Sequence, residues 1–138
     1  MKKIAILTLG LSLFANAHFL TFLSNTDNVT DQKQTKIDFD ISFIHPFEQS
    51  GMNMEKPEIF VNNKENKLVL KETKKFEHKA WSSSYDIKTP DVYKFFVQPQ
   101  PYFEPSEEKF ISHVPKLIIS SFGLEDGWDE PLGLKYEI

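Results

Sequence analysis

The stretch "TKIDFDISFI" constrains the fold more than any other part of the chain. Apolar and polar residues alternate through it, the apolar ones being Ile37, Phe39, Ile41 and Phe43. A period of two is typical of a β-strand that has one buried face and one solvated face. We therefore expect a half-buried strand here, and we expect it to end where it meets Pro46.

Further strands are predicted along most of the chain. Short β-like runs occur at residues 58–61, 67–71, 80–87, 92–98 and 109–120. Turn-forming residues divide them, among them Pro57 and the pair Pro90-Asp91. Regular short strands with turn signals between them predict a β-sandwich. In "TPDVYKFFV", Tyr93 is placed to tie down the preceding corner, as tyrosines do in immunoglobulin-like sandwiches.

The first seventeen residues have the pattern of a secretory signal peptide. Lys2 and Lys3 form a basic start, residues 4–14 are apolar, and "ANA" at 15–17 is a cleavage box. The apolar run is shorter than the roughly 20 residues that a membrane-spanning helix needs. We expect cleavage after Ala17, a single mature domain at residues 18–138, and a periplasmic location.

Composition excludes several functions. The chain has no cysteine, which rules out thiolate metal sites and redox chemistry. All its basic residues are lysines, and loss of Lys2 and Lys3 takes the formal net charge from −4 to −6. An acidic domain is a poor partner for nucleic acid, so we expect none.

Cleavage after Ala17 would leave a histidine at the mature N-terminus. The free α-amine and the imidazole of His18 could then chelate one metal ion, because the amine titrates near neutral pH and a metal can displace its proton. Nitrogen donors suit nickel, copper, cobalt or zinc better than calcium or magnesium. The alternative is that the peptidase reads only the alanine and that the next residue is incidental.

Three other histidines differ in context. His45 in "FIHPFE" is expected at a sheet rim beside Glu48, where sandwich domains build sites. His113 in "KFISHVPK" is predicted to lie within an apolar strand, as a ligand or as a packed residue. His78 in "KKFEHKAW" is expected on a solvated hairpin. The residues alone leave the ligand assignment open.

No enzymatic motif is present. The chain has no G-x-S-x-G, no phosphate-binding glycine loop, no H-E-x-x-H and no EF-hand loop. Met52 and Met54 in "MNMEKP" offer thioethers that could serve copper(I) or line an apolar loop. The prediction is a binding protein, not an enzyme.

Several stretches together resemble a known family. "AHF", "FIHPFE", "MNMEKPE", "YKFFVQPQPYFEPSEEKFISHVPKLII" and "GLEDGWDEPLGL" are similar to the exported DUF4198 domain, a relative of periplasmic NikM/NikK-like components of nickel and cobalt uptake. The resemblance implies an all-β, immunoglobulin-like antiparallel β-sandwich that binds Ni²⁺ or Co²⁺ and presents it to a membrane transporter. Its histidine positions fall on His18, His45 and His113, and its aromatic-Glu-Pro motif falls on Glu104. Cu²⁺ and Zn²⁺ also bind such donors.

Two alternatives remain beside the uptake hypothesis. A copper carrier or copper-protection protein is favoured by the two methionines. A non-metal interaction module would use the aromatic "PQPYFEP" loop to bind a protein or glycan. Members of the family usually continue into a second C-terminal β domain, so the sequence is also compatible with a chain that lacks one.

Overall fold

The computed structural model describes residues 18–62, 68–104 and 107–134, and this part of the chain contains strands and turns but no helix. It therefore contains no helix that is long and apolar enough to cross a membrane. The expected signal peptide lies outside the described residues. One sheet has the order β1-β3-β7-β6, and β4 pairs with β3. Its strands are β1 (Phe19–Ser24), β3 (Lys36–His45), β4 (Ser50–Met52), β6 (Lys71–Lys75) and β7 (His78–Asp86).

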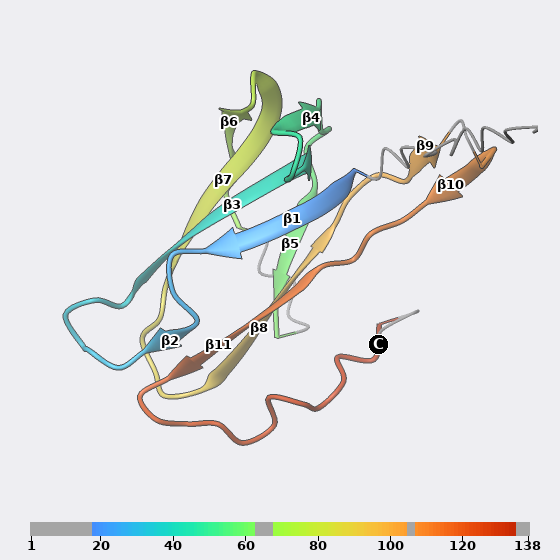
Figure 1. The fold of residues 1–138 in the computed structure, drawn as a ribbon. Coiled ribbons are helices and arrows are strands. Elements are labelled where there is room, and N and C mark those ends of the chain that lie inside the picture. Colours follow the sequence, from blue (N-terminus) through green and yellow to red (C-terminus); the bar gives the residue numbers. More distant parts are fainter. Residues whose placement is uncertain (1–17, 63–67, 105–106, 135–138) are drawn as a thin grey trace, which may run out of the picture.

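The second sheet has the order β2-β11-β8-β5 and faces the first (Figure 1). Its strands are β2 (Asn28–Val29), β5 (Glu58–Val61), β8 (Val92–Gln98) and β11 (Lys116–Ser121). The short β2 pairs with β11 in parallel, which departs from the predicted all-antiparallel pairing. The cause is that the chain crosses after β1 to the other sheet and joins its edge while running in the direction of β11.

A hairpin of β9 (Tyr102–Glu104) and β10 (Lys109–Ile111) forms a small third sheet. It extends beyond the sandwich at the end where β1 begins (Figure 1, orange). β9 lies in the "PQPYFEP" segment, which the sequence predicted to be a loop. Hairpin pairing satisfies the backbone groups of that extended segment.

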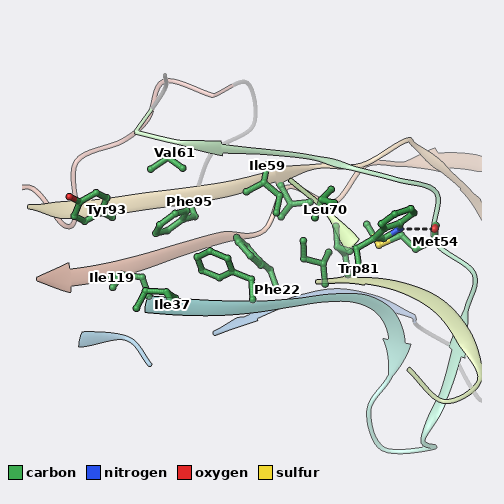
Figure 2. Packing of buried hydrophobic residues seen from close by; sticks show 14 of the residues in the cluster. Phe22, Ile37, Met54, Ile59, Val61, Leu70, Trp81, Tyr93, Phe95 and Ile119 are labelled. Atoms are coloured by element: carbon green, nitrogen blue, oxygen red, sulfur yellow. Dashed lines mark hydrogen bonds between the residues drawn. The ribbon is translucent and has the colours of Figure 1, made fainter. Parts of the chain in front are cut away.

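The core lies between the two sheets (Figure 2). The alternating residues of β3 point into it, and Ile37, Phe39 and Ile41 are at most 2% exposed. Phe95 from β8 lies against Phe39, with ring centroids 4.8 Å apart. Trp81 donates its indole N–H to the Met54 carbonyl at 3.0 Å, which satisfies its buried polar atom. The predicted alternation of β3 is therefore confirmed from Ile37 to Ile41, but it stops there, because Ser42 and Ile44 on the other face are buried as well.

The corner before β8 is fixed by Tyr93, as the sequence predicted. Its hydroxyl donates to the Thr89 carbonyl, four residues upstream, at 3.1 Å. A tyrosine at the start of this strand that bonds back to the preceding corner is typical of immunoglobulin-like sandwiches. The strand orders of the two sheets agree with such a sandwich, so the predicted fold class is confirmed.

The predicted strand at residues 109–120 is wrong in one respect, because it is two strands. β10 ends at Ile111, β11 begins at Lys116, and His113 lies in the connection between them. Pro115 lacks an N–H for a continuous ladder, although its carbonyl accepts a hydrogen bond from the Val97 N–H at 3.1 Å. β10 also pairs with β9, whereas β11 pairs with β8.

The strand predicted at residues 67–71 lies later in the chain, as β6 at Lys71–Lys75. Residue 67 lies outside the described residues. The two-residue turn between β6 and β7 is formed by Phe76 and Glu77, with φ of 47° and 64°. Two positive φ values indicate a type I′ turn, which Asn-Gly favours strongly. Phe76-Glu77 is not such a turn signal, so no local pattern placed a strand directly before it.

This turn gives a stability prediction. Replacing Phe76-Glu77 with Asn-Gly should stabilise the protein by about 1 kcal/mol, because L-residues with large side chains are strained in the left-handed region. The free energy of unfolding, measured by urea denaturation, provides the test. The matched control is Phe76→Ala with Glu77→Ala, which removes both side chains but keeps the strain and should not stabilise. Equal gains in both variants would contradict the turn explanation.

Candidate functional site

The side chains of His18 and His45 lie close together at the end of the sandwich where β1 begins and β3 ends; we call this the open end. β1 pairs with β3 up to Phe19 opposite Ile44, so the next step of the antiparallel register places His18 beside His45. Both follow the inward-facing positions of their strands, because side chains alternate along a strand. Their ring centroids are 6.2 Å apart and the rings are nearly perpendicular, at 74°. The predicted position of His45 at a sheet rim is confirmed.

The Phe43 ring lies at the centre of this end. The His18 ring is stacked on it, with centroids 6.0 Å apart and an angle of 14°. The His113 ring meets it edge-on at 5.5 Å, and Tyr102 contacts it at 5.2 Å. Phe43 is only 9% exposed. A buried phenylalanine therefore joins the two histidines, which come from opposite sides of the sandwich.

Glu48 and His45 contact each other as the sequence suggested. The Glu48 backbone N–H donates to His45 Nδ1 at 3.3 Å, and the Glu48 carboxylate lies 3.8 Å from the same nitrogen. One nitrogen cannot both accept the first bond and donate to the carboxylate, and the shorter contact favours the accepting form. Nε2 is then the nitrogen of His45 that has no role in this turn.

Burial lowers the pKa of the His113 imidazole below its ordinary value. His113 is half-buried in the connection between β10 and β11, not in a strand. A lowered pKa keeps the ring neutral at pH 7, the form that can bind a metal ion.

Glu104 lies on the β9–β10 hairpin, two residues after Tyr102 and on the same side of the strand. Burial, and then the charge of Glu104 and a hydrogen bond with it, raise the pKa of the Tyr102 hydroxyl. Glu104 is therefore linked to the histidines through Tyr102 and Phe43. Sequence reasoning had not selected these two aromatic residues, since nothing in their local pattern separates them from core residues.

The four candidate ligands lie around the aromatic rings of Phe43 and Tyr102. They do not converge on one point where a metal ion could bind. Among the described residues, no group of three or more His, Asp or Glu side chains is close enough to hold a metal ion. Two imidazoles on one ion have their nitrogens roughly 3 Å apart, because metal–nitrogen bonds are about 2.0 Å. The ring centroids of His18 and His45 are 6.2 Å apart, so the spacing of their nitrogens depends on how the two rings are turned. A His18 amine donor requires cleavage after Ala17.

His78 lies near this end but on the outer face of the first sheet. It begins β7 on the predicted hairpin, and its Cδ2 is 3.4 Å from where a Cβ on Gly51 would be. That contact covers the outer face of the sheet, whereas His45 faces inward. His78 is half-buried and lies on the hairpin that the sequence predicted. It serves as a control position below.

Two hollows accompany these residues. A cavity of about 220 Å³ opens beside Phe43 and is lined by Leu20, Phe43, Met52, Met54, Tyr102 and His113, among others. A larger groove of about 610 Å³ crosses the outer face of the first sheet beside Asp38, Asp40 and Ser82. Only the first contacts a candidate ligand. Sequence reasoning missed it, because its walls come from distant segments.

The fold and this site define an immunoglobulin-like β-sandwich with histidines at one end. Residues 15–138 match the family model described as "Domain of unknown function (DUF4198)". The chain belongs to this family. Searches of curated proteins and of solved structures find no match.

His113 gives a pH prediction. Because its folded-state pKa is lowered, the unfolded chain binds a proton first as pH falls below about 6.5, and the free energy of unfolding should then decrease. The decrease continues until pH reaches the folded-state pKa and is absent above about pH 7. Urea denaturation at steps between pH 5 and pH 7.5 measures it.

His113→Gln should flatten this dependence, whereas His78→Gln should leave it in place. A wild-type slope that persists in His113→Gln would assign the effect to another group.

Proposed function

We propose that this protein is an exported binding protein for a transition-metal ion, nickel or cobalt, which it carries as cargo and presents to a membrane transporter. The observation that carries the proposal is the placement of His18 beside His45 by the β1–β3 register. Nitrogen donors of this kind suit late first-row metals. The role in uptake rests on the resemblance to periplasmic nickel and cobalt components.

The chemistry expected of the site is binding without catalysis. The α-amine and imidazole of a mature N-terminal His18 would form a chelate, and Nε2 of His45 would supply a third nitrogen after rotation of its ring. His113 and Glu104 are the further donors that the resemblance marks. They lie behind Phe43 and Tyr102, so their direct participation would require these rings to move.

The test compares the mature protein that begins at His18 with a form carrying one extra alanine before it. The extension turns the amine into an amide and should weaken Ni²⁺ and Co²⁺ binding at least tenfold by isothermal titration calorimetry. His45→Gln should also weaken binding, and the matched control His78→Gln should not. Unchanged affinity in the extended protein would refute the chelate.

The metal itself is identified by native mass spectrometry of untagged protein purified from the periplasm without chelators. A mass that begins at His18 with one nickel or cobalt supports the uptake role. Bound copper supports the alternative of a copper carrier or protection protein. In vitro affinity does not decide this point, because copper binds such donors more tightly in any case.

A second candidate function has its own observation. Phe103 and Phe110 pack on each other on the β9–β10 hairpin at 5.2 Å and are 46% and 74% exposed. Exposed aromatic side chains are common at interaction sites, so an interaction module for a protein or glycan is the alternative. It predicts a melting temperature that does not respond to Ni²⁺, Co²⁺, Cu²⁺ or Zn²⁺, whereas specific binding would raise it.

A further inference from the structure

The cavity beside Phe43 is lined by both methionines of the proposed mature chain. Met52 and Met54 line its wall, and Met1 is the only other methionine in the sequence. His113 contributes an imidazole to the same wall, whereas His18 and His45 do not line it. The cavity therefore brings together two residues that carry sulfur donors and one that carries an imidazole, without His18 and His45.

The register of β3 with β4 directs Met52 toward this cavity. Met52 is the partner of Phe43 in the antiparallel pair. Directly opposed residues project from the same face of a sheet with their Cβ atoms about 5 Å apart. Since the Phe43 ring also contacts His113 at 5.5 Å, Met52 and His113 flank one aromatic ring.

Met54 is held in place by its backbone. Its N–H donates to the Lys79 carbonyl at 3.1 Å, and its carbonyl accepts the Trp81 indole N–H at 3.0 Å (Figure 2). The neighbouring Asn53 accepts the Lys79 N–H at 2.8 Å. With 6% of Met54 exposed, this segment is ordered before any ligand binds, which limits the entropy that binding would cost.

The cavity also favours a cation of low charge. Its one acidic side chain, Glu55, is paired with Lys79 at 2.9 Å, and the remaining lining is apolar or neutral. Neutral thioethers are soft donors that select copper(I), and imidazole suits copper as well. The cavity has a volume of about 220 Å³, whereas one water molecule needs only about 15 Å³. It is therefore large enough to hold an ion.

We propose that this cavity is a copper(I) site, with the sulfurs of Met52 and Met54 and the imidazole of His113 as ligands. It is distinct from the nitrogen site of His18 and His45 and does not depend on it. The two sites would take ions of different softness at the same end of the sandwich. His113 belongs to the cavity side of Phe43 in this assignment.

Trp81 supplies the readout, because it is hydrogen-bonded to Met54. The other tryptophan, Trp128, is 58% exposed, and Trp128→Phe leaves Trp81 as the single indole. Ag⁺ serves as the probe, since it is a soft monovalent ion that needs no reductant. Titration of the mature Trp128→Phe protein should quench Trp81 fluorescence at one equivalent, and competition with a copper(I) chelator should give a matching Cu⁺ affinity.

The matched variant carries Met52→Leu with Met54→Leu, which removes the sulfurs at nearly constant volume. It should lower Ag⁺ and Cu⁺ affinity at least tenfold, while its melting temperature and Ni²⁺ affinity stay close to those of the parent. His113→Gln should weaken Ag⁺ binding as well, and His78→Gln should not. Undiminished quenching in the double leucine variant overturns the proposal.

The outcome is separable from that of the nitrogen site. Loss of Ag⁺ binding in the leucine variant with Ni²⁺ binding intact supports two sites. Absence of Ni²⁺ binding would sink the proposed uptake role and leave the copper(I) site standing. A parent protein that binds neither Ag⁺ nor Cu⁺ at micromolar concentration contradicts the copper(I) site, whatever its behaviour with nickel.

Discussion

The inward register of β3 is the constraint on which core and site both depend. Its alternate residues enter the core at Ile37, Phe39 and Ile41, and the same face continues to Phe43 and His45 at the open end. A slip of one residue would turn every side chain of the strand to the other face. The cost of exposing three large apolar residues therefore also holds the imidazole of His45 in its orientation.

The absence of cysteine makes this packing necessary. No disulfide bridges the sheets, so apolar contact and a few buried hydrogen bonds set the spacing between them. Tyr93 fixes the corner before β8, and Trp81 ties the first sheet to the segment that carries Met54. Met54 also lines the cavity, so the hydrogen bond from Trp81 places a candidate ligand.

The local sequence pattern predicted those strands and contacts that depend only on residues within one short stretch of the chain. The alternation of β3, the bounds of β5 and β8, and the role of Tyr93 follow from short stretches of sequence. The break near Pro115 and the shift of β6 do not, because strand pairing decides them. β1 also escaped prediction, since its residues were read only as the region after a cleavage site.

The residues of the candidate site also differ in whether the local sequence predicts their positions. His45 was placeable, because Pro46 ends its strand and fixes it at a rim. The position of His113 depends on the pairing of β10 with β9, which no local pattern shows. The cavity could not be predicted from the sequence, because its lining comes from distant segments that are close only in the folded chain. Among the lining residues are Met52, Met54, Tyr102 and His113.

Phe43 contacts residues of both sets of candidate ligands at this end of the molecule. Its ring contacts His18 and His113, yet only His113 shares the cavity with the methionines. Of the two sites that we propose, one has nitrogen donors only, whereas the other adds two thioethers to the imidazole of His113, so metals would be sorted by donor type more than by affinity for a common site. Because both sides rest on one buried ring, an ion that moved Phe43 from one side would change the geometry on the other.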